Sequence, residues 1–258
     1  MELKEKISGL IITFNEEKNI QDILDDFSIC DEIIVVDSFS SDQTVTIAKQ
    51  NPKVKIIQHA FEDFTKQRNI ALDAATNDWV LFLDGDERIT PELQQEIIAE
   101  LNKSEKEDAY YFYRKFYFAG KQVNFSGTQT DKNFRLFRKS KCRYIAEKKV
   151  HETLAVNGSI GVFNNKLQHF SVSDYDSYRK KMIHYGELKG QELFAKGKHF
   201  SVVTQYLKSA FKFFKTYILR FGFLDGKEGY QLSVLQTLSV YETYESLKRE
   251  QTKSKFRQ

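Results

Sequence analysis

The sequence predicts an α/β fold, in which helices flank a mostly parallel sheet and a helical extension follows. Short apolar segments alternate with segments of helical periodicity through about the first hundred residues. Helical patterns without intervening strands then fill residues 177–258. Alternating strands and helices are typical of a parallel sheet, because each connecting helix covers one face of that sheet.

The first part of the chain contains four expected strands and four expected helices. The strands are predicted at residues 7–14, 32–36, 54–58 and 79–83. The helices are predicted at residues 17–27, 43–50, 65–75 and 91–101. The last of these follows Thr90 as N-cap and has Pro91 at its first position, an arrangement that favours a helix N-terminus.

The second part is richer in aromatic residues. Strands are expected at residues 110–118 and 133–138, with short strands and turns as far as residue 176. Helices are expected at residues 203–221 and 230–248. We therefore predict one domain at residues 1–176, with halves at 1–105 and 106–176, and a helical extension at 177–258.

The composition excludes several classes of protein. Of the 258 residues, 41% are hydrophobic and 29% are charged, which is typical of a folded globular protein. The formal net charge of +3 is too small for a polycation, so no nucleic-acid partner is expected. Cys30 and Cys142 have no paired spacing, which favours a reducing, cytoplasmic compartment. No apolar run has the length of a transmembrane helix, and we expect a soluble or peripheral protein.

An acidic turn follows the fourth predicted strand. Asp84 and Asp86 come directly after the apolar residues 79–83. In open α/β sheets the carboxyl ends of the strands are the edge where ligands bind. Carboxylate oxygens on a short turn suit Mg²⁺ or Mn²⁺ together with a substrate phosphate. The alternative is a solvated acidic turn before the next helix.

Neither glycine-rich phosphate motif, G-x-G-x-x-G or G-x-x-x-x-G-K-[ST], is present in the sequence.

Four segments in fixed order extend this interpretation. They are ITFNE at 12–16, IIVVDS at 33–38, KQRN at 66–69 and LDGD at 83–86. Together they resemble the family 2 glycosyltransferases with the GT-A fold, especially small bacterial enzymes similar to the lipopolysaccharide-core β-glucosyltransferases. The resemblance covers roughly residues 5–100 and continues more loosely through Val-His-Glu at 150–152.

The resemblance implies roles for residues at the strand ends. Asp86 would be the metal ligand, and Asp84 would lie near the ribose or the metal. Asp37 would hydrogen-bond to uracil, and Arg68 would contact the base or balance the charge of the donor. Thr13, Asn15 and Glu16 would line the nucleotide pocket. The alternatives are a capping role for Asp37 and an exposed helical position for Arg68.

Sugar transfer with inversion also requires a base for the acceptor hydroxyl. Glu152 is the candidate for this base, and His151 would orient it or bind metal or phosphate. A surface His-Glu pair is the alternative, and Asp131 is a weaker rival base. His59, His169, His184 and His199 have no metal-ligand spacing and are expected to be structural or surface residues, with His169 as the strongest exception.

The predicted function is metal-dependent, inverting transfer of a sugar, expected to be a hexose. The donor would be a UDP-sugar, and the acceptor a lipopolysaccharide-core or other cell-surface glycan or glycolipid. Sugar nucleotidyl transfer and non-catalytic binding of nucleotide sugars are the alternatives.

The helix at 203–221 has an apolar face opposite Lys208, Lys212 and Lys215. This helix either packs on the rest of the protein or lies on an anionic surface at the inner face of the plasma membrane. The C-terminal helices are also candidates for a homodimer contact.

Overall fold

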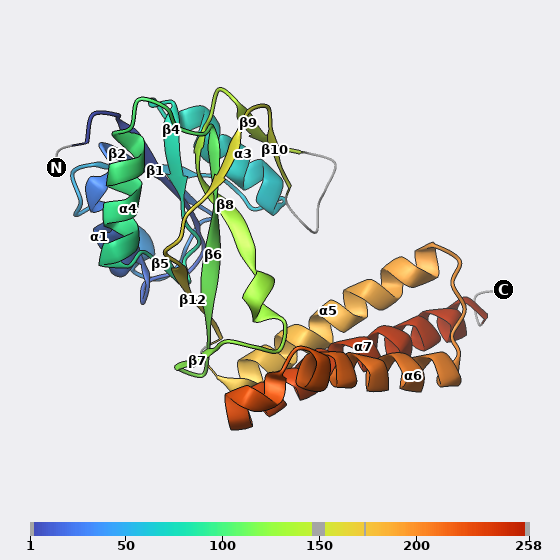
Figure 1. Cartoon of the computed structure of the whole chain (residues 1–258). Helices are drawn as coiled ribbons and strands as arrows, with labels where there is room; N and C mark the ends of the chain where they lie inside the picture. The colour runs from blue at the N-terminus through green and yellow to red at the C-terminus, as the bar shows by residue number, and fades with distance from the viewer. Residues whose placement is uncertain (1–2, 146–152, 173, 256–258) are drawn as a thin grey trace. The chain divides into compact units, whose positions relative to one another are not determined.

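The structure is a computed structural model that describes residues 3–145, 153–172 and 174–255. The chain divides into two compact units (Figure 1). The first unit comprises Met1–Arg114 and Lys132–His169, and the second comprises Lys115–Asp131 and Phe170–Gln258.

The first unit contains a sheet and the helices that cover it. Its strands are β1 (Ile7–Thr13), β2 (Glu32–Asp37), β3 (Val54–Gln58), β4 (Trp79–Phe82), β5 (Glu87–Arg88), β8 (Lys132–Arg138), β9 (Cys142–Tyr144), β10 (Leu154–Val156) and β11 (Ile160–Val162). Its helices are α1 (Ile20–Asp26), the 3₁₀ turn η1 (Phe27–Ile29), α2 (Thr44–Ala48), α3 (Phe64–Ala74) and α4 (Pro91–Leu101). Strands β6 (Ala109–Phe118) and β12 (Leu167–Val172) each contribute residues to both units.

The central strands confirm the predicted parallel sheet. Their order is β3-β2-β1-β4-β8-β6. Strand β1 is parallel to β2, with Thr13 opposite Asp37, and parallel to β4, with Leu10 opposite Phe82. Strand β8 is antiparallel to its neighbours β4 and β6. The carboxyl ends of β1, β2 and β4 therefore lie at one edge of the sheet.

Both faces of this sheet are buried. Ile7 and Ile11 of β1 belong to one apolar cluster, which also contains residues of α1 and α4. Leu10 points to the other face and packs in a second cluster with Ala71 and Leu72 of α3. Burying one such aliphatic side chain contributes about 1.5–3 kcal/mol, and this burial explains the continuous apolar runs in the sequence.

Two helix starts match the capping residues in the sequence. The Thr90 side chain accepts a hydrogen bond from the backbone N–H of Leu93, with Pro91 at the start of α4. The Asp63 side chain accepts from the backbone N–H of Lys66 at the start of α3. Helix α2 begins one residue later than predicted, and Asp42 binds the N–H and hydroxyl groups of Thr44 beside it.

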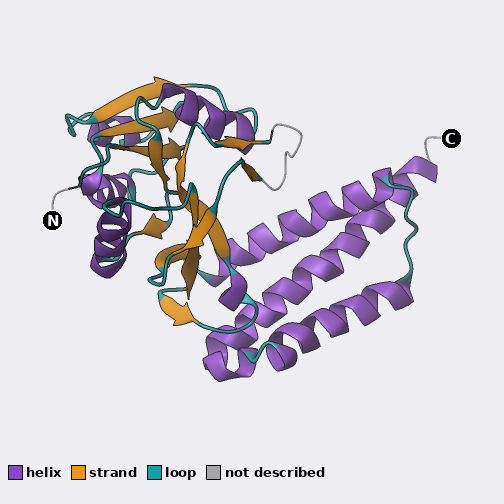
Figure 2. Cartoon of the chain, turned by 45° about the horizontal axis from the view of Figure 1, so that its top comes forward, coloured by secondary structure: helices purple, strands orange, loops and turns teal. Residues whose placement is uncertain are grey.

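The second unit is mainly helical (Figure 2). Its elements are β7 (Lys121–Val123), the 3₁₀ turn η2 (Thr128–Thr130), α5 (Tyr175–Ala195), α6 (Val202–Phe213), the π-helix η3 (Phe214–Leu219), the 3₁₀ turn η4 (Gly222–Asp225) and α7 (Gly226–Lys255). The compact units do not follow the predicted division at residue 176. Phe116, Phe118 and Val123 share an apolar core with residues of α5 and α7, so residues 115–131 pack with the helices.

Helices α5 and α7 approach each other closely at two glycines. A Cβ at Gly186 would lie 2.7 Å from the backbone oxygen of Ser239, and one at Gly190 would lie 2.5 Å from that of Thr243. A side chain at either glycine would therefore force the helices apart.

None of the helices in the described ranges is long and apolar enough to cross a membrane.

Helix α6 has its amphipathic faces reversed relative to an ordinary surface helix. Its polar residues Gln205 and Ser209 are buried, whereas Leu207 and Phe211 are 65% and 59% exposed. Gln205 donates hydrogen bonds to the backbone oxygen of Tyr241 and to Glu245 of α7. The apolar face that the sequence predicts is therefore real, but it does not pack within its own unit.

Candidate active site

Two side chains at the ends of β1 and β2 form the first part of the site. The Thr13 hydroxyl donates to the Asp37 carboxylate over 3.0 Å, and both residues are buried. The backbone N–H of Ser40 donates to the other Asp37 oxygen at 2.9 Å, and its hydroxyl donates to the first. Asp37 thus orders the loop after β2, and its carboxylate lies at the sheet edge as predicted from its position.

Asn15 and Glu16 occupy the loop that follows β1. Asn15 has a positive φ of 56°, and its side-chain oxygen accepts from the backbone N–H of Ser41. The Glu16 carboxylate lies against Gly85, where an added Cβ would come within 2.9 Å of its carboxyl carbon. Burial raises the pKa of Glu16, and the charge of Asp86 adds to this increase. The loop after β1 and the acidic turn after β4 are therefore in contact.

Arg68 joins α3 to the acidic turn. One of its terminal nitrogens donates to Asp84 at 2.6 Å. Its guanidinium lies over the ring of Phe82, 4.6 Å from the centroid, and Arg68 is 7% exposed. The alternative of an exposed helical arginine is therefore wrong.

Sequence reasoning missed a second arginine in the same cluster. Arg135 of β8 donates from Nε to Glu87 at 2.6 Å and from a terminal nitrogen to Asp84. Arg114 of β6 also donates to Glu87, at 3.1 Å. Glu87 in turn accepts from the backbone N–H of Asp84, and this bond closes the acidic turn.

The arginines control the charge of Asp84. Burial opposes ionisation of this carboxyl, but Arg135 and then Arg68 outweigh burial and hold its pKa well below the ordinary value. The same ion pairing raises the pKa of Arg135 against the effect of its own burial. Asp84 is consequently a carboxylate at neutral pH, with both oxygens accepting from guanidinium groups.

Asp86 is in a different environment on the same turn. Its Oδ2 atom lies 3.3 Å from Nε2 of His169, and its side chain is 39% exposed. His169 comes from β12 and is opposite Glu87 in the antiparallel pairing of β12 with β5. The structure therefore brings together a carboxylate and an imidazole, two groups that bind divalent metals.

The predicted base, its rival and the other histidines do not lie in the described part of the acidic turn. His151 and Glu152 lie outside the described residues. Asp131 belongs to the second unit. Among the described residues, no group of three or more His, Cys, Asp or Glu side chains is arranged to hold a metal ion. His59 forms a hydrogen bond with Gln67, and His184 is an exposed residue of the second unit.

The first unit thus has an α/β sheet with carboxylate, guanidinium and imidazole groups at the carboxyl ends of its strands, as in the GT-A class of transferases. The solved structure of S. aureus TarS residues 1–349 in complex with UDP has a similar fold, with a TM-score of 0.51. It is 17% identical in sequence, and the match covers 96% of this chain and 92% of that chain.

Sequence comparison identifies the family. Residues 8–157 match the family model "Glycosyl transferase family 2". The chain belongs to glycosyltransferase family 2. An uncharacterized glycosyltransferase of Rickettsia typhi is 30% identical over 242 residues, which cover 89% of this chain and 82% of the relative. The lipopolysaccharide core biosynthesis glycosyltransferase LpsC of Rhizobium meliloti is 26% identical over 197 residues, 74% of this chain and 73% of the relative.

Membership of this family makes the protein a glycosyltransferase. This assignment confirms the predicted family and fold, and it favours sugar transfer over the alternatives of nucleotidyl transfer and non-catalytic binding.

Proposed function

We propose that this glycosyltransferase takes its sugar, expected to be a hexose, from a UDP-sugar and transfers it with inversion in a metal-dependent reaction. The observation that carries the proposal is the carboxyl edge of the sheet, where Asp37 ends β2 and the turn with Asp84 and Asp86 follows β4. Arg68 is paired with Asp84 at this edge. A nucleotide sugar presents a base, a ribose and a diphosphate. The base and the ribose need hydrogen-bond acceptors, and the diphosphate needs positive charge.

The nucleoside would bind at the ends of β1 and β2. Asp37 is buried and fixed by Thr13, and a carboxylate held in this way can accept from the imide N–H of uracil. Asn15 and Glu16 line the same edge through the loop after β1. The UDP complex of the TarS fragment supports the choice of uridine only as an analogy of fold.

Asp86 and His169 are the proposed protein ligands of Mg²⁺ or Mn²⁺. A carboxylate oxygen and an imidazole nitrogen 3.3 Å apart fit such an ion, and these ions commonly complete their coordination with water and substrate phosphates. When bound, the metal would neutralise charge on the departing diphosphate. Because Asp84 already accepts from Arg68 and Arg135, we propose that it acts beside the metal and the ribose by holding these guanidinium groups.

Glu152 is the proposed base. Its carboxylate would remove the proton of the acceptor hydroxyl while the hydroxyl oxygen attacks the anomeric carbon and the bond to UDP breaks. Attack opposite the leaving group inverts that carbon. His151, the adjacent residue, would orient Glu152.

The acceptor is proposed to be a lipopolysaccharide-core or other cell-surface glycan or glycolipid, reached at the cytoplasmic face of the membrane. LpsC, a relative with a role in lipopolysaccharide core biosynthesis, supports this class. The exposed apolar face of α6 supports it independently. Residues 202–219 contain no acidic residue, and Lys208 in this segment is exposed, which complements an anionic lipid surface.

A donor screen tests the proposed reaction. Purified protein would be incubated with UDP-, GDP- and dTDP-sugars, with and without Mn²⁺, and donor hydrolysis would be measured. We expect turnover with a UDP-sugar that is lost in EDTA. Turnover unchanged by both EDTA and Asp86→Ala would overturn the metal assignment. Release of pyrophosphate from a nucleoside triphosphate and a sugar phosphate would instead support nucleotidyl transfer.

A further inference from the structure

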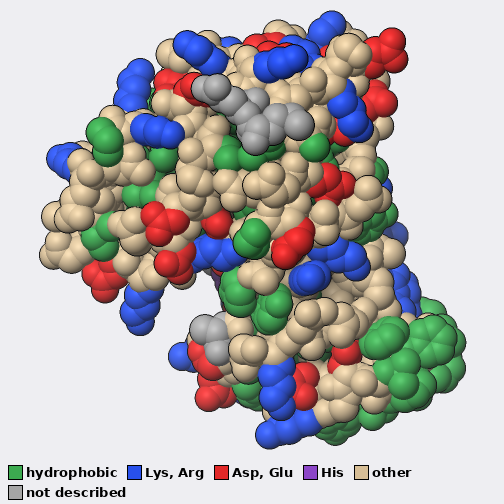
Figure 3. Space-filling model, turned by 60° about the vertical axis from the view of Figure 1, so that its left-hand side comes forward, with side chains coloured by type: hydrophobic (Ala, Val, Ile, Leu, Met, Phe, Trp, Pro, Cys, Tyr) green, Lys and Arg blue, Asp and Glu red, His purple; other side chains and the backbone are tan. Residues whose placement is uncertain are grey.

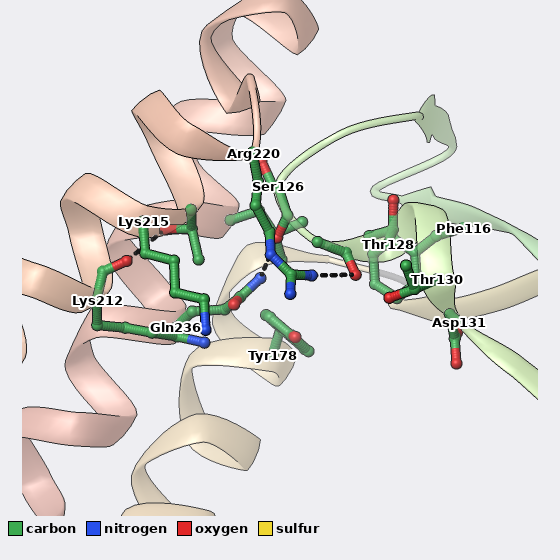
Figure 4. A pocket seen from close by; sticks show the side chains of 13 residues that line it. Phe116, Ser126, Thr128, Thr130, Asp131, Tyr178, Lys212, Lys215, Arg220 and Gln236 are labelled. Carbon is green, nitrogen blue, oxygen red and sulfur yellow. Dashed lines mark hydrogen bonds between the residues drawn. The ribbon is translucent and has the colours of Figure 1, made fainter.

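A basic cavity lies entirely within the second unit (Figure 4). It encloses about 400 Å³ between the turn after β7, α5, the segment α6–η3 and α7. This volume falls in the range of small-molecule sites, roughly 300–1,000 Å³. The acidic turn after β4 belongs to the other unit, so the cavity is a separate feature of the chain.

Three cationic side chains line the cavity: Lys212, Lys215 and Arg220. Figure 4 shows the side chains of Lys212 and Lys215 extending along different directions into the cavity, with the guanidinium of Arg220 near the middle of the view. No carboxylate among the described residues forms an ion pair with any of the three. Asp131 is the only acidic residue in the lining, so positive charge predominates.

The π-helix η3 brings the three cations together. The backbone N–H of Arg220 donates to the carbonyl of Lys215 at 2.9 Å, five residues earlier. This i→i+5 bond is the spacing of a π-helix, and it ends the segment at Arg220. π-Helical turns are rare and are found frequently at functional sites.

Local hydrogen bonds hold Arg220 in position. Its carbonyl accepts from the backbone N–H of Ser126 at 3.1 Å and from the side chain of Gln129 at 3.3 Å. Its guanidinium donates to the carbonyl of Gly127 at 3.4 Å. A side chain at Gly127 would meet this guanidinium at 2.9 Å, so the glycine leaves room for it. The cationic group is therefore fixed before any ligand arrives.

The cluster is unfavourable without an anion. Burial lowers the pKa of Lys212, and the charges of Lys215 and Arg220 lower it further. Tyr178 lines the same cavity with a hydroxyl that can donate, and burial raises the pKa of this hydroxyl to about 12. An anion in the cavity would relieve the repulsion and accept these hydrogen bonds.

We propose that this cavity binds a phosphate group that carries more than one negative charge. The ligand is either a membrane lipid with a phosphomonoester or diphosphate headgroup, or a soluble molecule with the same group. Lysine and arginine together suit phosphate, because arginine donates in a fork and lysine supplies compact charge. Phe214, Ile218 and Leu219 of η3 are 48%, 41% and 53% exposed, and this apolar surface on the same segment favours the lipid.

The test compares two triple variants of the full chain. The cavity variant carries Lys212→Gln, Lys215→Gln and Arg220→Gln. The control variant carries Lys180→Gln, Lys198→Gln and Lys227→Gln, which removes the same charge from exposed positions of the same unit. Titration calorimetry would measure pyrophosphate binding in excess UDP, so that a nucleotide site elsewhere is occupied. We expect the cavity variant to bind at least about tenfold more weakly than wild type, and the control to bind within about twofold of wild type.

Vesicle binding separates the two sources of phosphate. Phosphatidylcholine vesicles would contain phosphatidic acid or, at equal surface charge, phosphatidylserine. Preference for phosphatidic acid that only the cavity variant loses identifies a lipid phosphate. Pyrophosphate binding without that preference identifies a soluble phosphate. The proposal is overturned if wild type shows neither effect, or if the cavity and control variants behave alike.

Thermal unfolding would show whether the cavity variant is folded. Removing repulsion should leave the cavity variant at least as stable as wild type in phosphate-free buffer. Its melting temperature should no longer rise when pyrophosphate is added, whereas that of the control should still rise. These measurements do not involve sugar transfer, so their outcome is independent of the proposed reaction.

Discussion

Nε of Arg135 lies 2.6 Å from Oε2 of Glu87, and the two side chains are 4% and 0% exposed. This pair connects β8 to the acidic turn, and Arg135 also donates to Asp84. A buried pair of this kind is weak evidence for added stability, but loss of one partner leaves an uncompensated charge. The edge of the sheet that we propose as the donor site is thus stabilised by a buried charge network.

Replacement of Arg135 with Met should therefore be strongly destabilising. We expect the free energy of unfolding to fall by about 3–5 kcal/mol, because Glu87 and Asp84 lose their shared cation. Urea unfolding would measure this change. The control is Arg143→Met, which removes an exposed pair with Asp73 and should cost less than about 1 kcal/mol. Equal losses in the two variants would contradict the supporting role of Arg135.

The proposed metal ligands predict a selective loss of metal binding. Asp86→Ala and His169→Ala should each weaken Mn²⁺ binding in the presence of UDP by at least about 10- to 100-fold, because loss of a group that only orients a ligand already costs this much. Manganese electron paramagnetic resonance would measure the bound fraction. His184→Ala, at an exposed histidine of α5, is the matched control. Unchanged Mn²⁺ affinity in both site variants would remove this pair from the metal site.

The proposed base predicts a separation of binding from turnover. Glu152→Gln should lower sugar transfer by about 10²- to 10⁴-fold, because the amide cannot accept the proton of the acceptor hydroxyl. UDP affinity, measured by calorimetry, should remain close to that of wild type. Asp131→Asn tests the rival base in the same assay. If Asp131→Asn abolishes transfer and Glu152→Gln does not, the roles are reversed.

Asp26 predicts a pH dependence of stability. Burial raises its pKa from 3.8 to about 6, even though a backbone hydrogen bond from Ile89 lowers it. The folded state therefore binds this proton more tightly than the unfolded state. The contribution of Asp26 to stability is most favourable below the unfolded pKa and declines as the pH rises through about 6.

Asp26→Asn should accordingly stabilise the protein at neutral pH. After allowance for partial exposure, we expect a gain of about 1–2 kcal/mol in the free energy of unfolding at about pH 7.5. The gain should shrink towards pH 4, where the wild-type carboxyl is protonated. Denaturant unfolding at several pH values would measure the difference. A gain that is the same at every pH would indicate a cause other than ionisation.

The exposed face of α6 predicts membrane association. Leu207→Asp with Phe211→Asp should reduce co-sedimentation with anionic vesicles by at least about tenfold, since two apolar side chains leave the lipid interface. Leu188→Asp, at an α5 residue that is 43% exposed, is the control. Vesicle binding unchanged by the double substitution would contradict the membrane role. A reduced mass in solution would then indicate a homodimer contact.

The positions of the polar residues at the ends of β1, β2 and β4 were largely predictable. Apolar runs of five or six residues specify buried strands, and polar residues directly after them must lie at the carboxyl edge of a parallel sheet. Thr13 and Asp37 are consequently opposite each other, and Asp84 follows the neighbouring strand. Local periodicity carries this information because the register of parallel strands follows from which residues must be buried.

Arg135, Glu87 and His169 were less accessible to sequence reasoning. Arg135 and Glu87 are 48 positions apart and meet because β8 is antiparallel to β4. His169 reaches Asp86 through the pairing of β12 with the two-residue strand β5. The sequence did contain one indication of this pairing. Arg135 lies between the apolar residues Phe134 and Leu136 of β8, and a charged residue on a buried strand requires a partner.

By itself, the sequence determined the α/β fold, the order of its elements and the acidic turn at the sheet edge. These features follow from short-range patterns of burial and from residues that end strands or begin helices. Only the tertiary structure decided which charges are paired, that α6 buries its polar face, and that Lys212, Lys215 and Arg220 line one cavity. Such features depend on contacts between segments that are distant in the sequence. The free energies of these contacts depend on how the segments pack together, and the local pattern of residues does not determine that packing.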